Sequence, residues 1–367
     1  MNEYVILGGG IAGLACAIQL NKLGKQVQVF EKNLASHPFG HAFILMPNGL
    51  RALERLGINN GILQQGHSIQ QFKMQDTEGH LVSQQALNGA IGIRRETLLT
   101  SLRSSLPDNC IQYGKGVSYI KQDTINNRNQ IVFNDGSKAK GTYIIGADGI
   151  WSKTRQVIAK KSRLSQVRIR EIVSVIKAPK LAKEFNGIFL KTSHKNGGLA
   201  VGMLPCDQEH IVWFVQYDSH DHRLLETTLQ EQKERLFHLI RTWCHPIPTL
   251  VGQTDLSKSY VWHTTDLEPI PQYHKGNIVL LGDAAHVLLT LTSQGVSSAL
   301  EDSIALTDLI KQQPNDLVST AFKQYTNLRK PIMDQYFQMG RDLKEEFLYP
   351  IANPKKMSIP LAIKRSY

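Results

Sequence analysis

The apolar positions at the start of the chain change their spacing within a few residues. Residues 4–7 form a short β-rich run, and residues 12–23 carry apolar side chains at helical spacing up to Gly24. A second β-rich run, residues 26–31, ends in Glu31. The pattern predicts a strand, a glycine-containing turn, a helix and a second strand.

The pattern changes along the rest of the chain. Residues 69–82 predict a hairpin, and residues 166–261 contain short alternating runs that predict an antiparallel sheet with one helix at 224–243. Residues 276–281 then predict a buried strand, followed by helices at 295–310 and from 317 to about 338. The chain is therefore expected to be an α/β protein.

The length of 367 residues is enough for two domains. The changes of pattern predict a discontinuous Rossmann-like domain, made of residues 1–68, 90–165 and 266–345. They predict an antiparallel-sheet domain inserted into it, made of residues 69–89 and 166–265. Residues 346–367 are expected to form a C-terminal tail.

The charge and the cysteines exclude several classes of protein. The net charge of +11 favours anionic ligands, but no nucleic-acid-binding motif accompanies it. No run of 18 apolar residues suggests a membrane span, and the chain starts almost directly on its first strand, so we expect a cytoplasmic protein. Cys16, Cys110, Cys206 and Cys244 are widely scattered, so no metal site is expected.

The first turn has the chemistry of a phosphate site. Gly8, Gly10 and Gly13 have the G-x-G-x-x-G spacing, which permits a tight turn, a close approach of backbone N–H groups to a pyrophosphate, and close packing of helix and strand. Glu31 lies ~20 residues further on, where an acid accepts hydrogen bonds from a ribose. These features fit the ADP-ribose part of either FAD or NAD.

Two later motifs narrow this choice. Residues 146–149 have the sequence Gly-Ala-Asp-Gly, and residues 282–286 have the sequence Gly-Asp-Ala-Ala-His, with Gln294 and Gly295 downstream. Together with the first turn, this set resembles the flavoprotein monooxygenases of the para-hydroxybenzoate hydroxylase fold. These group A enzymes include tetracycline-inactivating monooxygenases, and the resemblance covers about residues 3–335.

The resemblance implies bound FAD and names its contacts. The first glycine turn would bind the pyrophosphate, Asp283 the ribityl chain, and the helix start at Gln294 the pyrimidine edge of the flavin. Arg95, rather than Arg94, fits the arginine of the family's R-x-x-L pattern, and Arg155 follows the turn at Asp148. The implied cofactor-binding residues are Gly8, Gly10, Ile11, Ala12, Gly13, Glu31, Lys32, Arg95, Asp148, Gly282, Asp283, Gln294, Gly295 and Val296.

The chain departs from the family pattern in the loop after Asp283. Family members usually carry prolines in this loop and a glycine before the glutamine, whereas Val287, Thr290 and Ser293 occupy those places here. His286 is common in the family, and we expect it to be a structural or cofactor-neighbouring residue and not a catalytic base.

The resemblance also implies a reaction. NAD(P)H would reduce FAD, O₂ would add to form a flavin C4a-hydroperoxide, and oxygen would pass to an aromatic or polyketide-like small molecule. A flavin-dependent halogenase or reductase of the same fold, or a non-catalytic FAD-binding sensor, are the alternatives. The protein is expected to be a monomer or a homodimer.

Substrate contacts are expected from the inserted sheet. Alternation along residues 210–217 places Trp213 and Tyr217 on one face and Phe214 on the other, and either face could meet the substrate. The sequence identifies no catalytic base. The candidate pocket residues are Phe189, Met203, Trp213, Phe214 and Tyr217.

Overall fold

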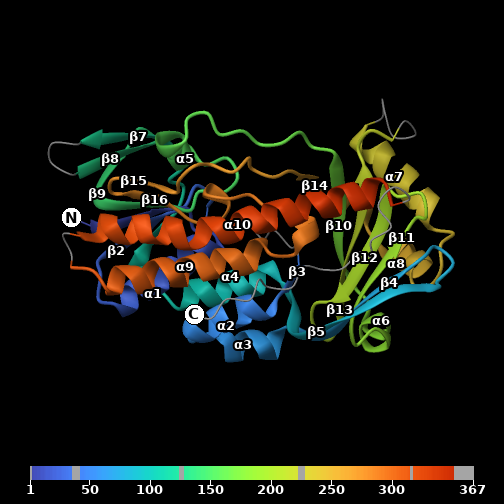
Figure 1. Cartoon of the computed structure of the whole chain (residues 1–367). Helices are drawn as coiled ribbons and strands as arrows, with labels where there is room; N and C mark the ends of the chain where they lie inside the picture. The colour runs from blue at the N-terminus through green and yellow to red at the C-terminus, as the bar shows by residue number, and fades with distance from the viewer. Residues whose placement is uncertain (1, 35–41, 124–127, 222–227, 315–316, 351–367) are drawn as a thin grey trace.

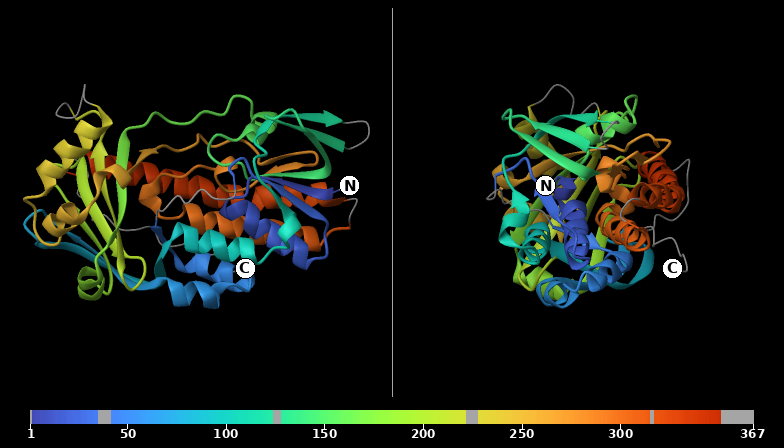
Figure 2. Two further views of the ribbon diagram at one scale, coloured as in Figure 1. Left: turned by 180° about the vertical axis from the view of Figure 1, so that it is seen from behind. Right: turned by 90° about the vertical axis from the view of Figure 1, so that its left-hand side faces the viewer.

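The strands of the protein form two eight-stranded sheets, which lie side by side in Figure 1. The computed structural model describes residues 2–34, 42–123, 128–221, 228–314 and 317–350. Figure 2 shows the same two-part arrangement from behind, with a long helix running between the parts. The predicted fold, a Rossmann-like domain combined with an antiparallel sheet, is confirmed.

The first sheet contains the predicted βαβ unit. Its main path has the strand order β15-β16-β9-β1-β2-β6, and β7 and β8 extend it beside β9. Neighbours among β1, β2, β9 and β16 pair in parallel. The strands are β1 (Asn2–Leu7), β2 (Val27–Phe30), β6 (Ile111–Gln112), β7 (Val117–Asp123), β8 (Arg128–Phe133), β9 (Lys138–Gly146), β15 (His274–Lys275) and β16 (Ile278–Leu280).

Helices cover this sheet and bury its apolar side chains. Helix α1 packs against both β1 and α9, and most of its residues are buried. Parallel strands need such cover because helices connect them and pack on their faces. The helices of this part are α1 (Ile11–Lys22), α2 (Pro47–Arg55), α3 (Asn59–Gln65), α4 (Arg95–Ser104), α5 (Lys153–Ile158) and α9 (Gly295–Lys311).

The second sheet has the strand order β14-β10-β13-β12-β11-β4-β5-β3. Its pairs are antiparallel except for β11 and β4, which run in parallel. Three helices, α6 (Pro179–Glu184), α7 (Leu229–Ile240) and α8 (Ile247–Gln253), lie on its outer side (Figure 1). The strands are β3 (Ala42–Leu45), β4 (His67–Gln75), β5 (Leu81–Arg94), β10 (Ile169–Lys177), β11 (Gly187–Ser193), β12 (Leu199–Pro205), β13 (His210–Asp218) and β14 (Tyr260–Thr264).

The sheet boundary differs from the predicted domain boundary. Residues 42–45 and 91–94 were expected with the Rossmann-like part, but they pair with each other as β3 and β5 in the second sheet. Strand β5 is long enough to reach from the predicted hairpin back to the first part of the molecule. The division into two domains at the predicted residues therefore stays a prediction.

The last helix, α10 (Val318–Leu348), is longer than expected and includes three residues of the predicted tail. It contains Pro331 and continues ten residues beyond the predicted end at Gln338. Its end packs against the second sheet, where Phe347 and Leu348 contact Ile169 and Ala200. This contact between distant segments stabilises a helical end that the local pattern does not show; residues 351–367 lie outside the described residues.

Candidate active site

Four parallel strands of the first sheet end at the same edge. Leu7 of β1 lies beside Phe30 of β2 and Gly146 of β9, and Gly146 lies beside Leu280 of β16. The residues that follow these strands are therefore neighbours: the first glycine turn, Glu31, and the turns at Asp148 and Asp283. The carboxyl edge of a parallel sheet is where such folds bind ligands.

The first glycine turn leaves space for an anion. Gly8 has φ +114°, and a Cβ there would overlap the Ala147 carbonyl oxygen, whereas a Cβ on Gly13 would overlap the Gly8 oxygen. A Cβ on Gly10 would meet no atom within 4 Å. No described side chain caps α1, so its first N–H groups are available to a phosphate.

Glu31 is bound to the glycine turn. Its Oε2 accepts a hydrogen bond from the Gly9 N–H at 2.7 Å, and its Oε1 accepts one from the Asn33 N–H at 2.8 Å. These bonds place the carboxylate at the rim of a pocket beside the turn. The pocket is lined by Gly9, Gly10, Glu31, Asn33, Leu34, Arg95, Leu99, Arg103 and Tyr113.

The Asp148 carboxylate is occupied by its own turn. Its Oδ2 accepts hydrogen bonds from the backbone N–H groups of Lys153 (2.8 Å) and Thr154 (3.0 Å), and its Oδ1 accepts one from Ser152 Oγ. Buried Arg155 then donates to the carbonyl oxygens of Asp283, Ala284 and Ile150. Asp148 thus caps α5, and Arg155 joins this turn to the turn at Asp283.

Asp283 presents a carboxylate that accepts no hydrogen bond from the part of the chain that the structure describes. Water reaches its side chain, but the surrounding protein limits hydration and raises the pKa of the carboxyl. The positive charges of His286, Arg95 and Arg155 lower this pKa and partly offset that effect. Such a carboxylate is suited to accept hydrogen bonds from sugar hydroxyls.

The loop after Asp283 ends at the start of α9. Ser293 has φ 53°, in the left-handed region, and buried Gln294 accepts a hydrogen bond from Asn48 Nδ2 at 3.1 Å. A Cβ on Gly295 would meet no atom within 4 Å, so the helix start faces open space. The N-terminal end of this long helix would stabilise a negative charge near its first N–H groups.

Comparison with known proteins identifies the cofactor of this chain. The family described as FAD binding domain matches residues 2–339. The chain belongs to this FAD-binding family. FAD is its cofactor, as the sequence resemblance implied, and the match covers both sheets and the helices between them.

Hydroxylases are among its relatives. The chain is 27% identical over 342 residues to FAD-dependent urate hydroxylase of Mycolicibacterium vanbaalenii, covering 89% of this chain and 84% of that protein. It is 25% identical to salicylate hydroxylase of Pseudomonas putida, covering 95% and 86%. HpxO of Klebsiella pneumoniae, solved with FAD and uric acid, shares the fold with a TM-score of 0.83 and 21% identity over 92% of this chain and 87% of that one.

The structure brings most predicted FAD contacts of this family member to one edge. The open space at Gly10, the uncapped start of α1 and the Asp283 carboxylate fit the pyrophosphate and sugar hydroxyls of FAD. Ile11 and Ala12 begin α1, and the Gly282 backbone packs beside Ala12. Val296 lies half-buried in the first turn of α9, while Lys32 is exposed at the rim. The assignment of each residue to FAD stays a prediction. The Asp148 carboxylate is bound within its own turn, so its predicted contribution is to hold that turn in place.

The sequence did not reveal a buried ionic network behind Asp283. Asp302 of α9 accepts hydrogen bonds from the Gly282 N–H (2.9 Å) and from Arg329 Nε of α10 (2.7 Å). Its Oδ2 also lies 2.6 Å from His286 Nε2. The available signal was an aspartate among the small and apolar residues of the helix predicted at 295–310. This network fixes the turn that presents Asp283, and His286 is part of it.

The two faces of the second sheet now separate the predicted pocket residues. Met203, Trp213 and Tyr217 are buried beneath α6, α7 and α8, and the Trp213 Nε1 donates to Thr254. Phe189 and Phe214 lie on the opposite face, with ring centroids 6.2 Å apart. Because helices cover the first three residues, we retain Phe189 and Phe214 as pocket candidates.

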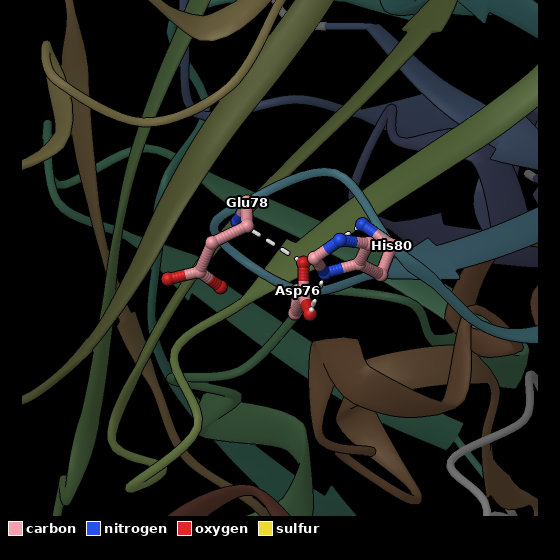
Figure 3. A group of neighbouring side chains, drawn as sticks. All are labelled: Asp76, Glu78 and His80. Carbon is pink, nitrogen blue, oxygen red and sulfur yellow. Dashed lines mark hydrogen bonds and ion pairs between the residues drawn. The ribbon is translucent and has the colours of Figure 1, made fainter.

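A separate polar group lies at the hairpin between β4 and β5. Figure 3 shows Asp76, Glu78 and His80, the group among the described residues whose ligand atoms lie close enough to suit a metal ion. Asp76 accepts hydrogen bonds from the N–H groups of Glu78 and His80 and from the His80 ring. These hydrogen bonds hold the exposed hairpin turn in shape, which explains why the three residues lie close together.

No helix within the described ranges is both long and apolar enough to cross a membrane. This finding agrees with the absence of long apolar runs in the sequence.

Replacing Glu31 by alanine is expected to weaken FAD binding by about 1–3 kcal/mol, because a charge-assisted hydrogen bond is lost. The change also frees the Gly9 N–H from its fixed partner. Titration of apoprotein with FAD, followed by flavin fluorescence, measures the dissociation constant. Glu31→Gln keeps an acceptor oxygen and should lose less affinity; equal affinity of wild type and both variants would contradict the ribose contact.

Proposed function

We propose that the protein is an FAD-dependent monooxygenase that uses NAD(P)H and O₂ to hydroxylate an aromatic small molecule. The observation that carries the proposal is the position of the two ends of one loop. Asp283 begins this loop, and the start of α9 at Gln294 and Gly295 ends it. Thr290 in the loop contacts the face of the second sheet that carries Phe189 and Phe214. The cofactor site and an aromatic surface therefore meet.

Different residues of the chain bind different parts of FAD. The glycine turn and Glu31 hold the adenosine end, Asp283 orients the ribityl chain, and the start of α9 stabilises negative charge on the flavin. Bound FAD supplies the redox chemistry that activates O₂. The apolar side chains of the second sheet orient the substrate ring and exclude water from the reacting atoms.

The alternatives differ in what becomes of O₂. The named relatives are hydroxylases, which favours a monooxygenase over a halogenase or a non-catalytic sensor. A reductase of the same fold would oxidise NAD(P)H without inserting oxygen. NAD(P)H as reductant, and a monomer or homodimer as the functional form, are part of this proposal.

The test is oxygen insertion by the purified, flavin-loaded protein. A panel of phenols, aromatic acids and N-heterocycles is screened for stimulated oxidation of NADH and NADPH, and products formed under ¹⁸O₂ are analysed by mass spectrometry. We expect a product that carries one ¹⁸O atom. Stimulated NAD(P)H oxidation with an unlabelled product would support the reductase instead, and no stimulation by any compound would contradict the proposal.

A further inference from the structure

Thr290 lies in the loop between Asp283 and Gln294 and contacts the buried carboxylate of Glu171. Thr290 occupies a place where the related family usually has proline, and its hydroxyl donates a hydrogen bond to Glu171 Oε1 at 2.5 Å. Thr290 is exposed, whereas Glu171 on β10 is only 6% exposed. The Thr290 hydroxyl therefore links the buried Glu171 carboxylate to the open space beside this loop.

Glu171 belongs to a polar chain that crosses the second sheet. Gln216 Nε2 on β13 donates to Glu171 Oε1 at 2.6 Å, and Lys191 Nζ on β11 donates to Gln216 Oε1 at 2.8 Å. All three side chains are buried. A buried carboxylate and a buried amine that share one connecting amide are electrostatically coupled, and a charge change at one end affects the other.

This polar chain adjoins the aromatic face. Glu171 pairs with Gln216 across β10 and β13, and the next residues on the same face, Val173 and Phe214, also pair. Phe214 pairs with Gly202 on β12, and Gly202 pairs with Lys191 on β11. Gly202 has no side chain, and the Phe214 ring covers its backbone. The face thus offers a planar apolar surface with proton-accepting groups at one end.

We propose that Thr290 and Glu171 form a proton relay that ionises a ring hydroxyl or ring N–H of the substrate. The inference rests on the proposed function and deepens it, because it names the substrate class: planar aromatic or heteroaromatic molecules with an acidic O–H or N–H. Ionisation makes such a ring more electron-rich, which favours attack on an electrophilic oxygen.

The proton transfers balance without any redox change. The substrate O–H or N–H bond breaks and a new O–H bond forms at Thr290 Oγ, while the original hydroxyl proton of Thr290 moves to Glu171 Oε1. Glu171 becomes a neutral carboxylic acid, and the negative charge moves to the substrate. Afterwards Thr290 accepts a hydrogen bond from Glu171 and donates one to the substrate anion.

The charged groups around Glu171 set the pH range of the relay. Burial raises the pKa of Glu171, while Thr290, Gln216 and the positive charge of Lys191 lower it. Burial lowers the pKa of Lys191 to about 8, against the charges of Glu171 and of Glu346 on α10. The relay needs ionised Glu171, so activity falls at acid pH.

Three variants of the flavin-loaded protein test the relay. Thr290→Val removes the hydroxyl, Glu171→Gln removes the proton acceptor, and Thr290→Ser restores the hydroxyl. We expect kcat to fall by roughly 10²-fold or more in the first two, the range of general-base effects, and to be near wild type in the third. Glu171→Gln should also lose the acidic limb of the pH profile. Glu209→Gln, which changes an exposed glutamate in the turn between β12 and β13, should match wild type.

A spectroscopic measurement separates the relay from turnover. 4-Nitrophenol, salicylate and urate are added to each protein below the solution pKa of the ionising group, and the absorbance of the bound compound reports its ionisation. Wild type and Thr290→Ser should bind at least one compound as the anion, and Thr290→Val and Glu171→Gln should bind it neutral. Unchanged kcat, pH profile and ionisation in both variants would overturn the relay, as would a wild type that ionises none of the three.

The two proposals fail in different ways. Ionisation of a bound compound without ¹⁸O insertion would leave the relay standing and reject the monooxygenase. Oxygen insertion that is equal in wild type, Thr290→Val and Glu171→Gln would leave the monooxygenase standing and reject the relay.

Discussion

Asp283→Ala is expected to be purified largely without flavin. The Asp283 carboxylate faces the site with no hydrogen bond from another described residue, so the ribityl hydroxyls would be its partners. Two charge-assisted hydrogen bonds of about 1.5–3 kcal/mol each would be lost. The affinity for FAD should therefore fall by roughly 10²- to 10⁴-fold. The ratio of flavin to protein absorbance after gel filtration, and a fluorescence titration of the apoprotein, measure this loss.

Asp283→Asn is the matched variant for this prediction. The amide keeps the shape of the side chain and one acceptor oxygen but removes the charge, so its flavin content should lie between those of wild type and Asp283→Ala. Far-ultraviolet circular dichroism checks that both variants are folded. Stoichiometric FAD in folded Asp283→Ala would show that another residue holds the ribityl chain.

Asp302→Asn is expected to lower the free energy of unfolding by about 3–5 kcal/mol, the cost of breaking a buried ion pair. Asp302 and Arg329 are both almost fully buried, and their atoms Oδ1 and Nε lie 2.7 Å apart. The substitution leaves the Arg329 guanidinium buried without its closest anion. Urea unfolding of the flavin-free proteins, followed by circular dichroism, measures the change without a contribution from bound FAD.

Asp308→Asn on the same helix is the control for the buried pair. Asp308 binds Arg55 at 2.8 Å, but both side chains are about half exposed. Exposed pairs contribute roughly 0–1 kcal/mol, so this variant should unfold almost as wild type does. An equal loss of stability in Asp302→Asn and Asp308→Asn would contradict the role assigned to the buried network.

The stability difference between wild type and Asp302→Asn also has an expected pH dependence. Burial acts to raise the pKa of Asp302, but His286 and Arg329 hold it well below its usual range. The contribution of a carboxylate with a lowered pKa is complete above the unfolded-state value of about 3.9. It is lost as the pH falls through the lower folded-state value. The difference should therefore be constant from neutral pH to about 5 and shrink in stronger acid.

Short segments of the sequence were enough to predict which residues contact the cofactor. Gly8 and Gly13 are required by local geometry, namely a positive φ and a close contact between helix and turn, and glycine alone satisfies these demands. The sequence also marks Asp283 as a polar residue at the end of a buried strand. Such signals remain visible without knowledge of the fold because each lies within a few neighbouring residues.

The proposed substrate side of the site depends on contacts between distant segments. Alternation in β13 defines two faces, but the position of α6, α7 and α8 over Trp213 decides that Phe214 belongs to the other face. The hydrogen bond from Thr290 to Glu171 joins residues 119 positions apart, and the bond from Arg329 to Asp302 joins two helices.

The amino-acid sequence therefore determined the cofactor and the turns and strand ends at which we predict that it binds, because turn and strand-end chemistry is local. The packed fold decided which face of the second sheet lies against the loop between Asp283 and Gln294, which buried charges support Asp283 and which carboxylate accepts the Thr290 hydrogen bond. Burial and charge pairing arise only when segments far apart in the chain pack together, and no local pattern encodes that contact.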